Sequence, residues 1–588
     1  MSDRVLEVQP FTERDNKAVF VSNTWDTYNN QRAGWIQQKI ELQNYLFATD
    51  TTTTNNSSLP WKNSTTLPKL TQIRDNLHSN YVSALFPNDK WLQWKGYTKR
   101  DNSRRKAKVI TAYMENKTRE SRYRQEVSRM LYDYIDFGNA FATVSFEKRY
   151  NKRKDGSLVP GYIGPRGHRI SPHDIVFNPL APTFEDTFKI VRSVKTLGEL
   201  KKMAMTQPEQ SFWQKALDNR IELRRRMAGY SKEDFDKSIS FSLDGFGSMY
   251  EYLRSDYMEI LEFYGDWHDS DTGELAINRM ITVVDRCLAV RDEEIATLDG
   301  RAPIRHVGWR TRPDNLWAMG PLDNLVGMQY RIDHLENAKA DAHDLVIHPP
   351  IKIKGEVEEF VWGPGAEIHL DENGDIEEVS RNLGALLAAN NDVQQIQDLM
   401  ELYAGAPREA MGIRTPGEKT AFEVDRLTTA ASRIFQEKIT AFETNLMEPN
   451  LNDQLEITIR NFDGSDVVRT MDNSLGVTEF ATITLDDISA SGVLRPVGAR
   501  HFAESANELQ NLVGIANSPL WALVQPHVSG INLTKFIEDV TSIAGYEIFR
   551  TNVAVQEGKD TQALMSMAGE DLAMEASAPV VPNRMPAE

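Results

Sequence analysis

Residues 412–420, GIRTPGEKT, come closest to a nucleotide-binding loop in this chain. A phosphate-binding P-loop reads G-x-x-x-x-G-K-[ST]; Gly412 and Gly417 have that spacing, but Glu418 separates Gly417 from Lys419. A P-loop also follows a buried strand, whereas the preceding segment is patterned as a helix, and Glu418 would bring a carboxylate to a polyanion. The sequence argues against phosphate binding here. A nucleic-acid ATPase using residues 412–420 is kept as an alternative function.

The metal-binding and catalytic patterns are also incomplete. DENGD at 371–375 begins like a calcium loop, but Ile376 stands where the turn glycine belongs. His343 and His348 have no neighbouring cysteine, and Cys287 is the single cysteine, which excludes a cysteine-based zinc site. No G-x-S-x-G or H-E-x-x-H motif occurs. We expect no catalytic residue, no metal site and no cofactor.

The composition sets the class of protein. The chain has 588 residues, 40% of them hydrophobic and 26% charged, which suits a soluble protein of several domains. No apolar run approaches the ~20 residues that a membrane span needs, and residues 1–17 lack the apolar core of a signal peptide. We therefore expect synthesis in a cytoplasm and no membrane partner. The formal net charge of −18 argues against a broad grip on nucleic acid, but it is compatible with a surface past which DNA slides.

The N-terminal half is patterned as mixed α+β. Apolar residues at helical spacing predict helices at 14–47 and 69–85, two more across 104–137, and a helical insert near 196–237. Alternating residues predict strands at 138–150, 168–178, 188–195, 256–266 and 276–290. Asp155–Gly156 is typical of a hairpin turn after the first of these strands.

The middle of the chain predicts two long helices joined by a small β-rich insert. The first follows Gly320–Pro321 and ends before Pro349–Pro350, so it would be roughly 40 Å long at 1.5 Å per residue. The second runs back to Tyr403. Narrow apolar stripes follow both helices, at Leu325, Met328, Ile332 and Leu335 on the first and at Val393, Ile396 and Met400 on the second. Such helices bury little alone, so we predict that neighbouring copies cover them in an oligomer.

A third long helix is predicted at 421–447, with a break at Glu448–Pro449. Residues 455–485 alternate like strands, with a predicted hairpin turn at Asp463–Gly464. Helices are then expected at 498–516 and 532–545, before a flexible tail rich in Ala, Pro and Met.

Four segments together resemble the portal, or head-to-tail connector, proteins of tailed bacteriophages, most closely those of short-tailed phages. They are YDYIDFGNAFATVSF (132–146), RISPHDIVFNPLAP (169–182), GPLDNLVGMQYRIDHLENAKADAHDLVIHPP (320–350) and YAGAPREAMGIRTPGEKTAFEVDRLTTAASRIF (403–435). Each is weak alone, and their order carries the resemblance, which covers most of the chain.

The resemblance implies an α+β portal fold that assembles as a ring. It divides the chain into an N-terminal mixed α/β wing (1–319), a stem helix (320–347), a β-rich clip (348–383), a returning stem helix (384–405), a tunnel loop (406–419), a long wing helix with a β segment (420–497), an α-helical crown (498–560) and a flexible tail (561–588). The C-terminal helices are too few and too broken for an extended barrel.

The resemblance also implies the roles of particular residues. The tunnel loop would face DNA through Arg408, Glu409, Gly412, Arg414, Pro416, Gly417, Glu418 and Lys419. The stem stripes would pack subunits together. The clip would contact a partner protein through Glu356, Glu358, Glu359, Glu377 and Glu378. Because these clip residues are acidic, we expect a basic patch on that partner and docking that weakens with salt.

The function implied is a ring, usually of twelve subunits, at one capsid vertex of the virion. Double-stranded DNA would pass through its channel during packaging and ejection. The expected partners are the terminase large subunit, a tail adaptor protein, and the major capsid and scaffolding proteins. Such a protein hydrolyses nothing itself, so we expect no enzyme activity. Besides the ATPase, a different ring-forming structural protein of capsid or tail remains an alternative.

Overall fold

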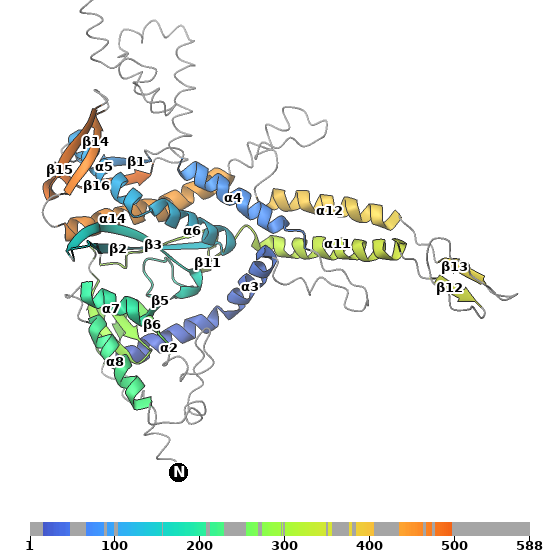
Figure 1. Cartoon of the computed structure of the whole chain (residues 1–588), viewed down its shortest axis with the longest axis horizontal. Helices are drawn as coiled ribbons and strands as arrows, with labels where there is room; N and C mark the ends of the chain where they lie inside the picture. The colour runs from blue at the N-terminus through green and yellow to red at the C-terminus, as the bar shows by residue number, and fades with distance from the viewer. Residues whose placement is uncertain are drawn as a thin grey trace, which may run out of the picture. The chain divides into compact units, whose positions relative to one another are not determined.

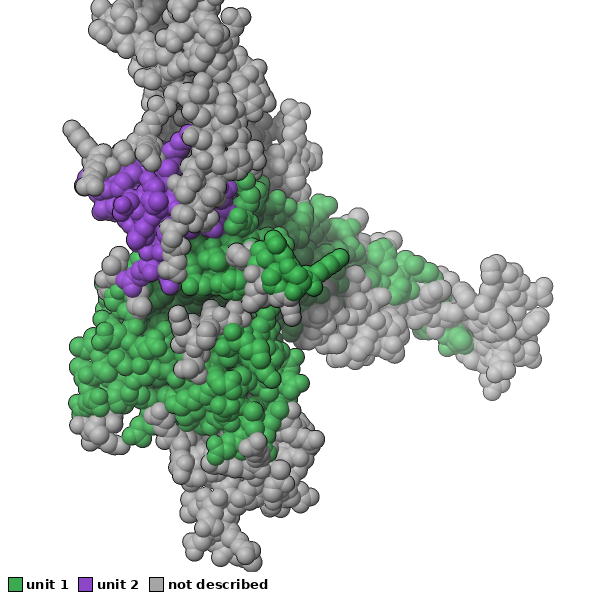
Figure 2. Space-filling view, turned by 60° about the vertical axis from the view of Figure 1, so that its left-hand side comes forward, with its two compact units in different colours: residues 1–84, 119–458 green, residues 85–118, 459–588 purple. Residues whose placement is uncertain are grey.

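A computed structural model of the chain describes its structure over most of the N-terminal 496 residues. The described residues are 16–47, 66–86, 91–98, 101, 104–155, 157–206, 212–227, 255–268, 273–295, 297, 300–347, 351–354, 375–378, 384–404, 434–462, 466–472 and 477–496. They form a mixed α+β protein with several sheets. The chain splits into two compact units, residues 1–84 with 119–458 and residues 85–118 with 459–588 (Figure 2).

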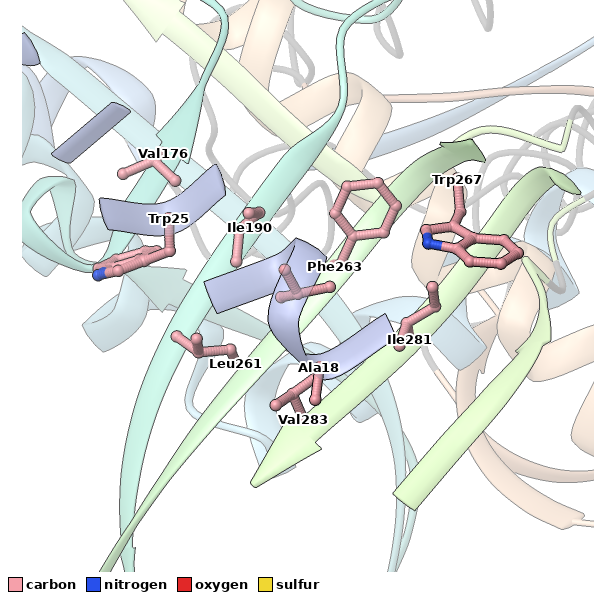
Figure 3. Packing of buried hydrophobic residues seen from close by; sticks show 10 residues of the cluster. Ala18, Trp25, Val176, Ile190, Leu261, Phe263, Trp267, Ile281 and Val283 are labelled. Atoms are coloured by element: carbon pink, nitrogen blue, oxygen red, sulfur yellow. The ribbon is translucent and has the colours of Figure 1, made fainter. Parts of the chain in front are cut away.

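The first unit is built on a five-stranded antiparallel sheet. Its strands, in spatial and chain order, are β4 (Ile175–Phe177), β5 (Lys189–Thr196), β6 (Tyr257–His268), β7 (Leu275–Val284) and β8 (Leu288–Glu294). Residues 258–261 and 263–264 of β6 are all buried, as expected of a strand with both faces covered. Helix α2 (Asn16–Gln31) covers one face, where Trp25 lies among Leu261, Val176 and Ile190 (Figure 3).

The other face of this sheet packs on two further sets of residues. Helices α7 (Leu197–Thr206) and α8 (Phe212–Met227) bury Met258 and Ile260. Tyr264 instead packs in an aromatic core with Phe141 and Trp317. This core joins the five-stranded sheet to a three-stranded sheet in the order β3 (Leu158–Ile170), β2 (Asn139–Lys152), β9 (Ile304–Gly308).

The β2–β3 hairpin confirms the turn predicted at Asp155–Gly156, because Lys152 pairs with Leu158 across it. Helix α6 (Tyr123–Asp136) packs on this sheet and buries the apolar residues whose helical spacing predicts it, Tyr123, Val127, Met130, Leu131 and Tyr134. Gly167 on β3 allows a close approach, since a Cβ there would lie 2.8 Å from the ring of Tyr123 and 2.9 Å from Gln454.

Three expected elements are each divided in the structure. The strand expected at 168–178 contains the end of β3, a 3₁₀ turn at Pro172–Asp174 and β4. The helix expected at 14–47 is two helices, α2 and α3 (Ala33–Phe47), separated at the buried Arg32. The strand expected at 276–290 is the β7–β8 hairpin, which turns at Asp285 and Arg286 with φ of 49° and 57°. Both turn residues have the left-handed conformation of a type I′ hairpin, but neither is the Asn or Gly that normally signals one.

The long helix pair is present in the first unit. Helix α11 (Val326–Ile347) follows a 3₁₀ turn at Asp323–Leu325, so the α-helix begins five residues after Pro321. Helix α12 (Gly384–Tyr403) lies beside it, and strands β12 (Ile351–Lys354) and β13 (Asp375–Glu378) pair antiparallel beyond their ends (Figure 1).

The predicted break at Glu448–Pro449 is wrong. Residues 434–461 are helical without interruption, with a π-helical turn at Glu443–Met447 before α14 (Glu448–Asn461). A proline removes one helical hydrogen bond and its ring clashes with the preceding turn. The wider π turn directly before Pro449 relieves that crowding, so the helix continues.

The strands expected from residue 455 also begin later. Residues 455–461 belong to α14, and the hairpin is formed by β14 (Asp466–Asp472) and β15 (Val477–Ile483). Its turn therefore lies between 472 and 477, and the prediction at Asp463–Gly464 is wrong. The predicted helices at 498–516 and 532–545 lie outside the described residues.

The second unit contains this hairpin and a short two-stranded sheet. Strand β1 (Leu92–Gly96) pairs antiparallel with β16 (Gly492–Pro496), which joins segments about 400 residues apart in the chain. Most of helix α5 (Arg104–Glu120) belongs to the same unit. Among the described helices of either unit, none has the length and apolar character to cross a membrane.

Candidate functional site

The tunnel-loop residues, Arg408 to Lys419, lie outside the described residues, as do Glu356, Glu358 and Glu359 of the clip. The two remaining clip residues, Glu377 and Glu378, lie on β13. Glu377 is 69% exposed and its carboxylate lies 3.6 Å from the ammonium of Lys352 on β12. This exposed pair contributes at most about 1 kcal/mol to stability, so Glu377 is available to a partner.

The predicted stem stripes turn out to be mostly interior. Leu325, Ile332, Val393 and Met400 are buried, and Met328, Leu335 and Ile396 are half-buried. The chain itself covers the first four side chains. A neighbouring subunit could therefore not reach these four side chains. Contact between subunits would have to use other side chains of helices α11 and α12.

Helix α11 also buries a polar stripe that the sequence analysis missed. Gln329, Asp333, Asn337 and Asp341 recur every four residues, and each is at most 4% exposed. Side chains four apart lie on one face of a helix. The regular spacing of these polar residues was a visible signal, but polar residues at that spacing normally indicate a solvated face.

The first two residues of this polar stripe, Gln329 and Asp333, form hydrogen bonds at the start of helix α4 (Lys69–Leu85). The first backbone N–H groups of a helix lack partners within it. Gln329 accepts from the amide of Leu70 at 3.2 Å and donates to the carbonyl of Leu67 at 2.6 Å. Asp333 Oδ1 accepts from the amide of Leu67 at 3.0 Å and from Gln329 at 2.9 Å. Gln329 thus takes the place of the usual Ser or Asp N-cap of α4, and Asp333 holds Leu67, which precedes the helix.

The second oxygen of Asp333 is buried and has no hydrogen-bond partner among the described residues. Burial raises the pKa of Asp333, and this outweighs the opposing effect of the Leu67 amide and Gln329. A carboxyl group in such a place is costly to ionise. The hydrogen bonds of Asp333 to Leu67 and Gln329 therefore use Oδ1 alone.

Two buried lysines tie the helix pair to the rest of the unit. Lys69 at the start of α4 forms an ion pair with Glu401 on α12, and both side chains are at most 6% exposed. Lys39 on α3, 1% exposed, forms an ion pair with Asp323 just before α11. Burial lowers the pKa of Lys39, and the nearby Asp323 opposes that shift. Removing either partner would leave a buried charge uncompensated.

The outer face of the pair is apolar near the end of α12. Leu399, Leu402 and Tyr403 are 42%, 54% and 59% exposed. Their spacing of three and four residues places them on one side of the helix. The exposed Val346 and Ile347 of α11 lie at the other end of the pair, beside β12. Leu399, Leu402 and Tyr403 therefore form an apolar patch of their own near the base of the pair, a candidate contact surface.

One side-chain cluster resembles a catalytic arrangement but lacks its geometry. Ser145 Oγ lies 2.8 Å from His168 Nε2, and Glu147 Oε1 lies 3.2 Å from the same nitrogen. In a catalytic triad the carboxylate holds the opposite ring nitrogen, so that the first can accept the proton of serine. Here hydroxyl and carboxylate compete for one nitrogen. In the described part of the chain, no group of three or more His, Cys, Asp or Glu is placed to hold a metal ion.

Comparison with known proteins gives no relative: no protein-family model matches the sequence, and no curated protein sequence matches it significantly.

Proposed function

We propose that this chain is a portal protein of a tailed bacteriophage, a subunit of the ring through which double-stranded DNA enters and leaves the capsid. One observation supports this most strongly. A long antiparallel helix pair with a small β hairpin at its tip, α11–β12–β13–α12, is inserted between an α+β region and a further long helix. A portal stem and clip have this order. The tunnel loop would follow α12.

The helix pair suits a mechanical role because its base is held firmly. The Lys39–Asp323 and Lys69–Glu401 ion pairs and the capping of α4 by α11 fix both helices to the same unit. The exposed side chains Leu399, Leu402 and Tyr403 remain for contact with the next copy in a closed ring, where each subunit offers the same face. We propose a ring of twelve copies.

The charge of the chain supports the passage of DNA rather than its retention. With a net charge of −18, the ring would repel phosphates over most of its surface. Cations of the tunnel loop, Arg408, Arg414 and Lys419, would give a brief, sequence-independent hold that Glu409 and Glu418 limit. Terminase and the tail adaptor would dock on the acidic clip, the capsid and scaffolding proteins would surround the ring, and the assembled protein would reside in the virion.

The ring can be tested with variants of its proposed interface. Replacing Leu402 and Tyr403 by Lys places charge on an exposed face near a helix C-terminus, where cations are tolerated. The fold should survive, and native mass spectrometry should detect monomers or open arcs in place of closed rings. The matched control replaces Leu275 and Ile277 on β7 by Lys as well. These side chains are 58% and 60% exposed, and the change should leave the rings intact. Closed rings at the parent yield from the Leu402/Tyr403 variant would refute this interface.

A further inference from the structure

The β2–β3 hairpin carries a concentration of positive charge in an acidic chain. Strand β9 pairs with β2 only over residues 139–143, so the rest of the hairpin, residues 144–168, is a ribbon of two strands. This β2–β3 ribbon contains six Lys or Arg and two acidic residues, a formal charge of +4 in a chain whose net charge is −18. The ribbon is therefore the element to examine for an anionic partner.

The two acidic residues of the ribbon are held by groups within it. The carboxylate of Glu147 forms ion pairs with Arg149 at 2.6 Å and with Arg166 at 3.4 Å. Asp155 Oδ1 accepts from the amide of Ser157 at 3.0 Å and from the hydroxyl of the same residue at 2.7 Å. Such a local bond from an Asp side chain stabilises a turn. Both carboxylates therefore serve the fold of the ribbon.

The cations at the end of the ribbon are open to solvent. The side chain of Arg149 is 57% exposed, and Arg153 and Lys154 beside the turn are exposed as well. The side chains of Arg153 and Lys154 form no ion pair or hydrogen bond with any described residue. An anion can therefore reach these two charges without breaking a contact within the described part of the chain.

The shape and composition of the ribbon indicate which anion fits. The major groove of duplex DNA admits a two-stranded β-ribbon. A protein partner would need an apolar centre to bury, but Tyr150, at 42%, is the single exposed large apolar side chain among the described residues of the ribbon. A phosphate backbone needs only exposed cations and hydrogen-bond donors such as the tyrosine hydroxyl. Both observations favour DNA over an acidic protein.

The base of the hairpin is fixed to two helices of the same unit. Arg169 at the end of β3 donates through Nη2 to the carboxylate of Asp133 on α6 at 2.7 Å. Asn450 on α14 donates to the carbonyl of Thr143 on β2 at 3.3 Å. An anchored ribbon presents its cations in a defined place, so less conformational freedom is lost when a ligand binds.

We propose that the end of the β2–β3 ribbon binds the phosphate backbone of double-stranded DNA without sequence preference, through Arg153, Lys154 and the flanking Arg149. Cations that neutralise phosphates release the counter-ions of DNA, so the affinity falls as the salt concentration rises. Because the rest of the chain is acidic, the contact is local. It depends neither on the tunnel loop nor on the closing of a ring.

The test measures binding of the full-length protein to relaxed, covalently closed circular duplex DNA, by filter binding over a series of salt concentrations. Circular DNA cannot thread a closed ring, so this binding does not report on the proposed channel. We expect saturable binding by the parent at low salt. Arg153→Glu combined with Lys154→Glu should weaken it about tenfold or more, and should reduce the slope of log affinity against log salt by about 2.

The matched control is Lys201→Glu combined with Lys215→Glu, which makes the same change of net charge at exposed positions of α7 and α8 and should bind DNA like the parent. Polyglutamate should compete poorly, because it lacks the groove and the phosphates of DNA. Four results would each overturn the proposal: no saturable binding by the parent, unchanged affinity and salt slope in the ribbon variant, equal losses in the two double variants, or full competition by polyglutamate at an equal concentration of charge.

Discussion

His306 is a largely interior histidine whose surroundings hold it neutral. Its ring stacks on Phe141 with centroids 4.6 Å apart and lies 4.9 Å from Phe184. Asn139 donates through Nδ2 to the carbonyls of Phe137 and Ala318, so its Oδ1 is an acceptor, and His306 Nε2 lies 3.0 Å from that oxygen. The neutral tautomer with the proton on Nε2 fits this contact. Burial lowers the pKa of His306 to about 3.

This depressed pKa predicts acid sensitivity. A histidine that titrates near 6.5 when unfolded and near 3 when folded binds its proton more readily in the unfolded chain, so stability is complete above about pH 6.5 and falls as pH drops towards 3. Between pH 6.5 and 4 the loss should be on the order of 3 kcal/mol. His306→Gln keeps a donor for Asn139 and removes the titration. Its free energy of unfolding, measured by urea denaturation, should fall less between pH 6.5 and 4 than that of the parent.

His334→Gln, on the exposed face of α11, provides the control and should follow the parent. An identical acid response of the His306→Gln variant and the parent would show that other groups cause the loss of stability.

Single residues also mark the limit of what the sequence reveals. The apolar stripe of α6, including Val127 and Leu131, was predicted and is buried. Burial of Gln329 and Asp333 was not predicted, because their partners are the backbone groups of Leu67 and Leu70, about 260 residues earlier in the chain. Helical spacing reports which residues share a face, but it does not report which distant segment covers that face.

At the scale of elements, the junction between α11 and α4 should be a shared unit of stability. Gln329→Ala removes the acceptor of the buried Leu70 amide, and the Leu67 carbonyl keeps only its bond from the Lys69 amide. We expect the free energy of unfolding to fall by about 1–3 kcal/mol. Hydrogen exchange should accelerate at the amide of Leu70, in the first turn of α4, because that amide loses its acceptor.

The matched control for Gln329→Ala is Arg331→Ala, an exposed position on the same helix, which should leave both measurements unchanged. If exchange at the Leu70 amide stayed slow in Gln329→Ala, the Gln329 hydrogen bond would contribute nothing to the first turn of α4.

Elements with strong local signals were predicted well, and those whose form depends on packing were not. Helix α4 (Lys69–Leu85) has the predicted bounds, and a hairpin formed by β2 and β3 surrounds the turn predicted at Asp155–Gly156. The Asp285–Arg286 turn escaped prediction because Arg286 rarely adopts a positive φ, and its ion pair with Glu259 supports that conformation here. The helix break predicted at Pro449 is wrong for a related reason, because the π turn at Glu443–Met447 relieves the steric clash of the proline ring.

At the scale of the whole molecule, the proposed portal function depends on how copies of the chain assemble. The helix pair presents exposed Leu402 and Tyr403 beside a base of buried ion pairs. An acidic chain that closes into a ring would surround a channel through which DNA moves without being trapped. A nucleic-acid ATPase or a different structural protein of capsid or tail would give a different particle.

Electron microscopy of the purified full-length protein tests this claim most directly. The account predicts hollow rings in end views, with twelve-fold symmetry and an opening wide enough for duplex DNA. Side views should show a broad body and a narrower stalk, formed by α11, α12 and the β12–β13 hairpin. Particles that remain monomeric, or that form rings without a stalk or a continuous channel, would contradict the assignment as a portal.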